Sequence, residues 1–443
     1  MESPTDYVIR FILDTNWQNI PTDVQHQSKR CLLDTLGALL AGTETPVGRL
    51  MAGIAIAQFN GNDATIFVSG SRVSASGAAL VNGFAGNALD IDDGYRLIKG
   101  HPGACVLPAV LTAGEMIPSC SGKQFLTALV VGYEIGIRSG LIRHARYETY
   151  HSSGSWGALA GAAAAGKIMG LDSTILRNAL GTAEYHAPIS PMMKGIAKPS
   201  MVKDGIGWGA MVAVMSVLMA QKGFTGIEPL FDDTPKAEWC DMLGHAYEIL
   251  NLYFKPYAAC RWAQPAIAGA LKIIKDHKIS PEVIIRIQVR TFTEATTLSC
   301  SPPKDTEQAQ YNLSFPLAAA LVDGEVGPKQ VMPPRIYNDQ ILRLADKVDA
   351  EVSEAFDRVF PEKACAEVII HTTSGTGFSS GTIEARWEPP ADPPSDDDLE
   401  EKFTWLVTPV LGVEQSRKLC ALIWRLDECD NVKTLVDLCV KRL

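Results

Sequence analysis

The residues best suited to catalysis or ligand binding lie where long apolar segments are followed by short polar loops. Asp90, Asp92 and Asp93 end one such segment, and His101 follows shortly after in the sequence His-Pro-Gly. Proline suits the first turn of a helix, so we expect His101 at a helix N-terminus, where free N–H groups and the helix dipole favour a bound carboxylate. The same position lowers the pKa of a histidine, which would keep the imidazole available as a base.

Other interpretations of these residues stay open. If the preceding helix continues to its end, Asp90 and Asp93 share one face, but the acids could also cap a surface loop in which His101 has a structural role. A metal site built from the aspartates and His101 is weaker, because it offers one imidazole and flexible spacing. We therefore expect no metal here.

Two more titratable residues stand at the mouths of apolar helices. His151 precedes a Ser/Gly loop and an alanine-rich helix, an arrangement that can present an imidazole to a cleft between helices. Lys203 precedes the uncharged stretch 205–221, where partial desolvation would lower its pKa towards that of a general base or leave it to pair with an anionic substrate. A capping histidine and a snorkelling lysine are the structural alternatives.

The segment 254–266 supplies candidates for substrate binding. It places Lys255, Tyr257 and Arg261 within one short non-periodic stretch, and an arginine can clamp a carboxylate with two parallel hydrogen bonds. A surface loop with solvated charges is the alternative. Polar residues in and around these segments complete the predicted binding set: Asp93, Arg96 and Gln264.

The composition of the chain limits which classes of protein it can belong to. At 443 residues, with 47% hydrophobic and 20% charged residues, the chain is expected to form two globular domains. Its formal net charge of −10, without a basic run, argues against a nucleic-acid partner. The ten cysteines are scattered singly and the N-terminus lacks a signal-peptide pattern, which fits a cytoplasmic protein. We expect the stretch 205–221 to be a buried core helix rather than a membrane span.

The elements that would position the candidate residues change character along the chain. Residues 1–265 show helix after helix, with apolar residues at helical spacing and small residues that allow close packing. Residues 266–390 mix helices with β-branched runs and a hairpin, which predicts a smaller α+β domain. Residues 388–398 form a Pro/Asp-rich linker. The amphipathic tail 399–443 cannot bury its apolar face alone, so we expect it to dock back and complete a discontinuous, all-helical domain.

Taken in order, several of these segments resemble the MmgE/PrpD family, which includes 2-methylcitrate dehydratases, cis-aconitate decarboxylases and an iminodisuccinate epimerase. The resemblance implies a mainly α fold with a smaller α+β lid domain, a homodimer, and neither metal nor cofactor. It also implies that Asp90, His101, His151 and Lys203 are site residues, with a further cation at Lys255. The segments that carry it span nearly the whole chain and include ALVNGFAGNALDIDDG (79–94), HPGACVLPAVLTAGE (101–115), HSSGSWGALAGAAAAGKIMGLD (151–172), MVK (201–203) and FKPYAACR (254–261).

The chain also departs from the family pattern at four places around the expected cleft. Gly94 stands where many members have threonine, and Gln264 where histidine is frequent. Phe315 replaces the tyrosine of a motif in which Asn312 also replaces a serine. The residues after Lys203 differ as well. These changes predict a substrate other than cis-aconitate or 2-methylcitrate.

The chemistry that the family shares is the making or breaking of a bond at a carbon next to a carboxylate. We expect Lys203 and Arg261 to neutralise carboxylates of a small anionic substrate, His101 and His151 to act as base and acid, and Asp90 to orient a histidine. A dehydratase is favoured, ahead of an epimerase and a decarboxylase that would use the same groups. A member that only binds a ligand, without catalysis, is the alternative of another class. No membrane partner is expected.

Overall fold

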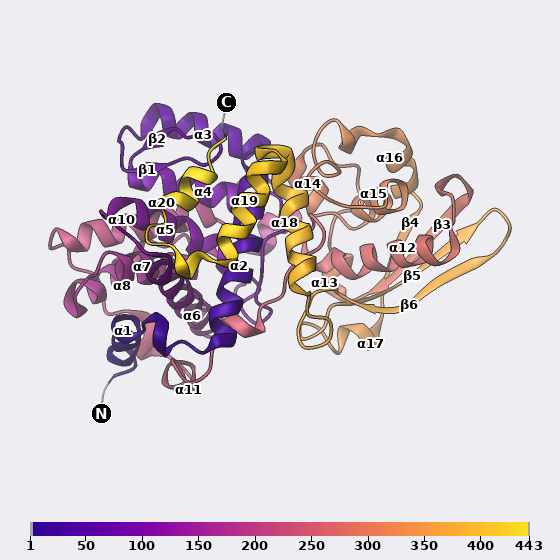
Figure 1. Ribbon diagram of the computed structural model, residues 1–443. Helices are drawn as coiled ribbons and strands as arrows, with labels where there is room; N and C mark the ends of the chain where they lie inside the picture. Colours follow the sequence, from indigo (N-terminus) through magenta and orange to yellow (C-terminus); the bar gives the residue numbers. More distant parts are fainter. Residues whose placement is uncertain (1–2, 442–443) are drawn as a thin grey trace.

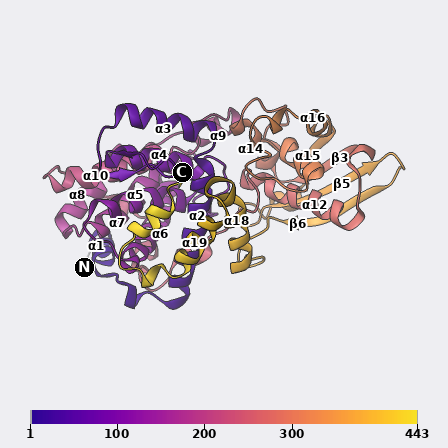
Figure 2. The same ribbon diagram turned by 45° about the horizontal axis from the view of Figure 1, so that its top comes forward.

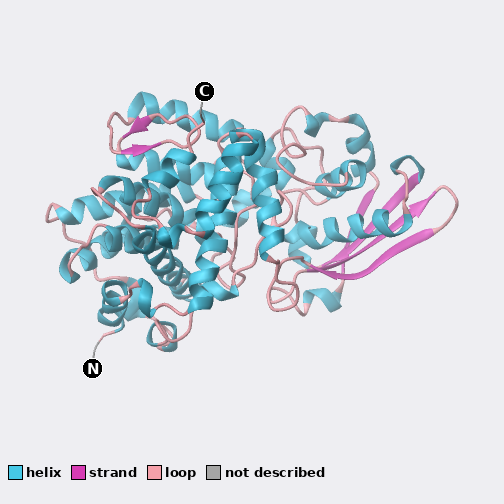
Figure 3. Ribbon diagram, in the orientation of Figure 1, coloured by secondary structure: helices cyan, strands magenta, loops and turns pink. Residues whose placement is uncertain are grey.

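The computed structural model of the protein describes residues 3–441. Helices dominate, as the sequence predicts, and most of them gather in one part of the molecule while a four-stranded sheet lies in the other (Figures 1 and 3). Below, the helical part denotes residues 3–253 and 396–441, and the sheet part denotes residues 254–395. The mainly α character that the sequence predicts is confirmed.

The helical part begins with a series of helices interrupted by one small hairpin. Three further helices reach it from the C-terminal end of the chain. Its elements are α1 (Pro4–Asp14), α2 (Thr22–Gly42), α3 (Pro46–Gln58), β1 (Ala64–Thr65), β2 (Arg72–Val73), α4 (Ala75–Asn87), α5 (Pro102–Met116), α6 (Gly122–Arg146), α7 (Gly154–Ile168), α8 (Ser173–His186), α9 (Met192–Ala197), α10 (Ile206–Gln221), α11 (Glu238–Asp241), α18 (Asp396–Leu411), α19 (Val413–Trp424) and α20 (Lys433–Leu438).

Small residues let the central helices α6, α7 and α10 pack closely. A Cβ added at Gly136 of α6 would lie 2.7 Å from the Cβ of Ala160 on α7, and one added at Gly161 of α7 would lie 2.8 Å from the Cβ of Ala213 on α10. These glycines therefore fix the separation of the three helices. By length and composition α6 could cross a membrane, but its apolar stretch is entirely buried among the other helices.

The C-terminal helices lie against the first long helix of the chain. Figures 1 and 2 show α18 and α19 beside α2, although hundreds of residues separate them in the sequence. Lys402 of α18 forms a buried ion pair with Asp34 of α2 and donates a 2.6 Å hydrogen bond to the carbonyl of Ile91. The tail thus holds the backbone of the loop that carries Asp90 and Asp92.

The sheet part is a mixed sheet with helices packed on it. Strand order is β4-β3-β5-β6, with β3 and β4 parallel and the other pairs antiparallel. Helix α12 packs on β5 and β6, and α15 packs on α12. The elements are α12 (Gln264–His277), β3 (Ile284–Thr291), α13 (Thr293–Thr296), α14 (Thr306–Gln310), α15 (Ser314–Asp323), α16 (Asp339–Ala345), β4 (Val348–Val352), α17 (Glu354–Asp357), β5 (Cys365–Thr372) and β6 (Gly377–Glu384).

One detail of the predicted organisation is wrong. The first 265 residues are not all helical, because β1 and β2 pair as an antiparallel hairpin whose strands are too short to show an alternating pattern. The Pro/Asp-rich segment is anchored at its start, since Glu388 is buried and pairs with Arg261 at 2.7 Å. Its last residues already belong to α18, which begins at Asp396 after the capping residue Ser395.

Candidate active site

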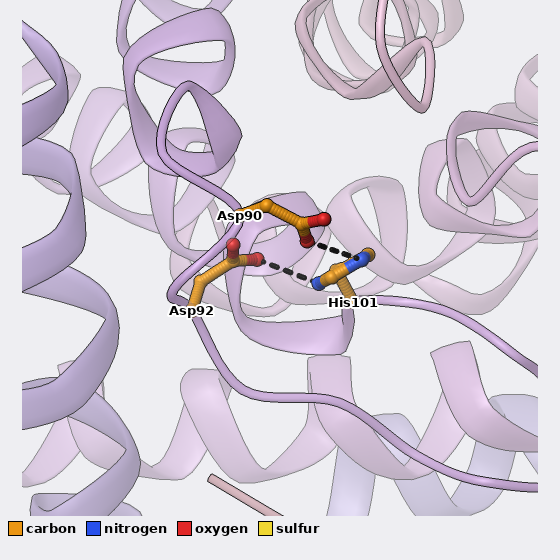
Figure 4. A group of neighbouring side chains, drawn as sticks. All are labelled: Asp90, Asp92 and His101. Carbon is orange, nitrogen blue, oxygen red and sulfur yellow. Dashed lines mark ion pairs between the residues drawn. The ribbon is translucent and has the colours of Figure 1, made fainter. Parts of the chain in front are cut away.

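His101 stands at the N-terminus of α5, as the His-Pro-Gly sequence predicts, and carboxylates surround its ring. It is the N-cap residue of that helix, with Pro102 in the first turn. Its Nδ1 lies 3.0 Å from Oδ2 of Asp92, and its Nε2 lies 3.3 Å from Oδ2 of Asp204 and 3.5 Å from Oδ1 of Asp90. Figure 4 shows Asp90 and Asp92 facing the two sides of the imidazole.

These carboxylates decide the protonation state of His101. Burial opposes a charge on the ring, but the carboxylates, with Asp92 foremost, outweigh it and raise the pKa of His101 to about 10. The prediction that the helix terminus lowers this pKa is therefore wrong. Three carboxylates lie within hydrogen-bonding range of the ring, and their effect on the pKa is larger than that of the helix dipole. At neutral pH the side chain is an imidazolium, suited to donate a proton rather than to accept one.

Asp90 and Lys255 form a buried ion pair beside the imidazole. The Nζ of Lys255 lies 2.6 Å from Oδ1 of Asp90, and both side chains are almost completely buried. Burial favours the neutral acid, but Lys255, Lys203 and His101 together hold the pKa of Asp90 well below its usual range. Asp90 does not continue α4, which ends at Asn87; its φ of 51° lies in the left-handed region, a strained conformation that turns the chain into the site.

Lys203 approaches this group from the turn before α10. Its Nζ donates a hydrogen bond to the side chain of Gln310 and lies 5.0 Å from the ring centre of Tyr311. The residue has a φ of 45° and is half-buried. Lys203 therefore borders the pocket behind Tyr311, close enough to Asp90 to lower its pKa, but it does not line the cavity.

A small pocket opens next to these groups, between the helical part and the sheet part. Its volume is about 50 Å³, which is room for a few water-sized groups. The helical part contributes loops and α9 to its wall, and the sheet part contributes the segment 255–262 and two residues after α17. The lining residues are Asp90, Arg96, Lys99, His101, Tyr150, Met192, Ile196, Asp204, Tyr253, Lys255, Cys260, Arg261, Trp262, Tyr311, Phe360 and Pro361.

Of the predicted site residues, Asp90, Arg96, His101, Lys255 and Arg261 lie on the wall of this pocket. Arg261 does not present a free guanidinium, because its Nε and Nη2 bond the carboxylate of Glu388 at 2.7 and 2.8 Å. Both terminal nitrogens also donate to the carbonyl of Pro361 at 3.2 Å. A substrate carboxylate would have to compete with Glu388 for this arginine.

His151 is buried outside the pocket lining. Its ring stacks on His144 with centroids 4.3 Å apart, and its Nδ1 lies 2.6 Å from Oγ of Ser155. Burial, with help from Arg143, lowers the pKa of His151, which favours the neutral ring. The flanking residues do reach the site, since Tyr150 lines the pocket and Ser153 accepts a hydrogen bond from the backbone N–H of His101.

Three predicted binding residues, Asp93, Tyr257 and Gln264, do not line the cavity. Asp93 accepts hydrogen bonds from the hydroxyl of Tyr133 at 2.6 Å and from the N–H of Gly103 at 2.9 Å, so it caps α5 from below. Burial and the nearby Asp34 raise the pKa of Asp93 to about 7. Gln264 donates to the backbone carbonyls of Tyr257 and Ala259, and the side chain of Tyr257 is buried.

Several residues on the pocket wall have no signal in the sequence pattern. Asp204 is buried against His101, yet in sequence it merely follows Lys203. Tyr150, Tyr253 and Tyr311 bring three phenols to the cavity from distant segments. Their grouping follows from the approach of the two parts of the molecule, which residue spacing does not encode.

Asp90, Asp92 and His101 also form a trio of potential metal ligands, whose ligand atoms lie within 4.8 Å of one another. The donor set fits a metal poorly, because the Lys255 ammonium already neutralises Asp90 and each ring nitrogen of His101 faces a carboxylate. A cation would have to displace both the ammonium and the imidazolium proton. The arrangement is better suited to holding protons than to holding a metal ion.

Comparison with known proteins gives family matches over most of the chain. Residues 8–245 match the model of the MmgE/PrpD N-terminal domain, and residues 257–428 match that of the MmgE/PrpD C-terminal domain. The human cis-aconitate decarboxylase is 25% identical over 443 residues, which covers 94% of this chain and 90% of that protein. The cis-aconitate decarboxylase-like protein oryM of Aspergillus oryzae is 25% identical over 98% of this chain and 96% of its own length, and the cis-aconitate decarboxylase of Aspergillus terreus is 23% identical over 95% and 92%.

Proposed function

The chain belongs to the MmgE/PrpD family, and from this premise we propose that it is a carboxy-lyase that removes CO₂ from a small unsaturated polycarboxylate of the cis-aconitate class. The observation that carries the proposal is the cluster of carboxylates from Asp92, Asp204 and Asp90 around the ring of His101, which favours its protonated form. Dehydration and epimerisation begin with a base that takes an α-proton. Decarboxylation needs an acid at carbon, which is the role that His101 suits at neutral pH.

The proposed reaction moves one electron pair and one proton. In a substrate such as cis-aconitate, the bond to the departing carboxylate breaks, CO₂ leaves, and the electron pair shifts through the double bond to give a dienolate. The imidazolium of His101 protonates the dienolate at carbon, and the ring regains its proton from water. Lys255, on the pocket wall, stabilises the negative charge that collects on the conjugated carboxylate.

This proposal differs from the order that the sequence alone favours, in which a dehydratase comes first. The relatives described above carry the names of decarboxylases, and the protonated His101 supports the same order. We further propose that the sheet part serves as a lid, since Arg261, Trp262 and Phe360 close one wall of the pocket. Closure would exclude water from the dienolate.

The direct test is to incubate the purified protein with cis-aconitate and with other small unsaturated di- and tricarboxylates, one at a time in deuterated water, and to follow the products by NMR. The expected outcome is release of one CO₂ for each substrate consumed, with one deuteron at a carbon of the product. The variant His101→Gln should lower turnover by roughly two orders of magnitude or more. Water addition or loss with hydroxylated polycarboxylates, without CO₂ release, would instead establish a hydro-lyase.

Independence from metal ions is part of the proposal and has its own test. Lys255 supplies beside Asp90 the positive charge that a metal would otherwise provide. Prolonged dialysis against a chelator should therefore leave turnover unchanged. A loss of activity that returns on adding one divalent metal would contradict this element of the proposal.

A further inference from the structure

Tyr253 and Gly94 are locked together beside the pocket. Their backbones pair in both directions, with each N–H donating to the carbonyl of the other at 2.9 Å. A Cβ added at Gly94 would lie 2.2 Å from Cζ of Tyr253 and 2.3 Å from its Oη. The phenol therefore occupies the space that any side chain at position 94 would need, and only glycine allows the ring to lie there.

The phenol of Tyr253 has the features of a ligand-binding group. The side chain is buried and lies on the pocket wall, with the guanidinium of Arg261 5.2 Å from its ring centre. Within residues 3–441 no hydrogen-bond acceptor is found for its hydroxyl. Burial raises the pKa of Tyr253, so the hydroxyl keeps its proton. The hydroxyl is not one of the fully enclosed side-chain atoms that lack a partner, so on the pocket wall it is open to a ligand that accepts its hydrogen bond.

The surroundings of Tyr253 define what that acceptor would be. Lys255 lies two residues further along the chain and Arg96 lies on the same pocket wall, so the field at this end of the cavity favours an anion. The ring limits the length of any group that enters, because it fills the space beside Gly94 in a pocket of about 50 Å³. Of the groups in a small polycarboxylate, a short carboxylate arm meets both conditions.

We propose that Tyr253, admitted by the absence of a side chain at Gly94, selects the substrate by binding the carboxylate arm that is retained and by limiting that arm to a single carbon beyond the reacting skeleton. The inference rests on the proposed function for its substrate class. It assigns to Tyr253 a role in specificity, separate from the proton transfer by His101.

Calorimetric titration tests the inference without requiring turnover. The probes are propane-1,2,3-tricarboxylate and its longer homologue butane-1,2,4-tricarboxylate, which are saturated and cannot react by the proposed route. Tyr253→Phe removes only the hydroxyl and should weaken binding of the shorter probe roughly tenfold or more, as expected for loss of a hydrogen bond to a charged group. Tyr253→Ala should change the ratio of the two affinities roughly tenfold in favour of the longer probe, because it opens the end of the cavity.

Gly94 supplies a second, independent arm. Gly94→Ala should weaken binding of the shorter probe by displacing the ring, whereas Gly94→Ala combined with Tyr253→Ala should bind like Tyr253→Ala alone. Such non-additivity is expected only if the two positions share one space. Tyr337→Phe is the matched control, because its exposed hydroxyl bonds the carbonyl of Lys304 outside the pocket.

The outcomes separate the inference from the proposed function. Affinities of Tyr253→Phe equal to those of the unaltered protein, additive effects of the two changes, or no binding of either probe would overturn the inference. Binding that depends on Tyr253, together with no CO₂ release from any unsaturated polycarboxylate, would leave the inference standing and remove the reaction. Melting temperatures measured alongside identify a purely structural effect, which would also count against it.

Discussion

At the scale of single residues, the site works through the proton on His101. Asp92 and Asp204 lie within 3.3 Å of its two ring nitrogens, and Asp90 lies slightly further away. Because these carboxylates outweigh the cost of burial, the imidazolium persists far above the ordinary pKa of histidine. The protonation state of His101 decides whether it can act as an acid or as a base. The carboxylates of Asp90, Asp92 and Asp204 set this state, and the helix that carries the histidine does not.

This charge state predicts the pH profile of turnover. If protonated His101 is the acid, kcat should stay level through neutral pH and fall as the pH rises through about 10. Asp92→Asn removes the carboxylate that raises this pKa most, so the alkaline limb should move to lower pH by about one unit or more. Rates measured over a pH series for both proteins check this. Turnover that rises with pH between 6 and 8 would mean that His101 acts as a base.

The Asp90–Lys255 pair makes a second prediction, about stability. Lys255→Met leaves the carboxylate of Asp90 buried without its closest partner, which should lower the free energy of unfolding by about 3–5 kcal/mol. Combining it with Asp90→Asn removes the unpaired charge and should recover most of that loss, while turnover stays low. Urea unfolding followed by circular dichroism measures both. Equal stability of the single and double variants would show that the pair is not energetically coupled.

The residue scale also shows what the sequence could and could not predict about the site. His101 and Lys255 could be predicted from the sequence, because a helix start and a short cation-rich stretch are recognisable in the local residue pattern. The partner Asp204 was not, because its position against His101 depends on how α10 packs beside α4 and α5. His151 has the expected local setting, yet tertiary contacts turn its ring towards His144. Its part in catalysis stays a prediction.

At the scale of elements, the placement of Asp90 depends on how α4 packs against α2. Gly42, the last residue of α2, touches the backbone of α4: a Cβ there would lie 1.9 Å from the carbonyl oxygen of Ala85. Helix α4 ends two residues later at Asn87, just before the turn that carries Asp90. The distance between the two helices at this point therefore sets where the aspartate loop begins.

Two glycine-to-alanine changes test this dependence as a matched pair. Gly42→Ala should force α2 and α4 apart, lowering the free energy of unfolding by roughly 1–3 kcal/mol and reducing turnover. Gly53→Ala, on the exposed side of α3 with nothing within 4 Å of the added Cβ, should raise stability by about 0.5–1 kcal/mol and leave turnover unchanged. Thermal and urea unfolding of both variants give the comparison. A neutral Gly42→Ala would contradict the close contact.

The same scale explains which elements the sequence predicts well. Helix α10 has a clear apolar pattern and lies within the stretch 205–221 that the sequence predicts, and β5 and β6 form a hairpin within 266–390, as the sequence also predicts. Strand β4 has no such pattern, because its side chains are mostly exposed and backbone pairing with β3 holds it in the sheet. The hairpin β1–β2 consists of two residues per strand. Strands that depend on backbone pairing alone leave little trace in residue type.

At the scale of the whole molecule, the surface around α10 remains to be accounted for. Trp208 is 50% exposed and Met215 37% exposed on the outer side of this helix. More exposed apolar side chains belong to the chain on either side of it, among them Tyr185, Val202 and Phe224. Isolated monomers rarely expose large contiguous apolar patches, so this concentration along one segment favours a covered surface. Helix α9, which precedes α10 in the sequence, contributes Met192 and Ile196 to the pocket wall.

We therefore predict that the protein is a homodimer in solution and that the outer side of α10 lies in the interface. Light scattering coupled to size exclusion should give twice the monomer mass of 47.8 kDa. Trp208→Glu places a charge in the predicted interface and should shift the equilibrium strongly towards monomer, because an unpaired buried charge is expensive. Ile285→Glu, on an exposed position of β3, is the control and should leave the dimer intact.

Two outcomes would contradict this prediction. A monomer at micromolar concentration would mean that the protein forms no stable dimer, and dissociation by the β3 change alone would mean that the interface lies elsewhere. Because α9 borders the active site, dissociation by Trp208→Glu should also lower turnover, which links the assembly of the molecule to the pocket around His101.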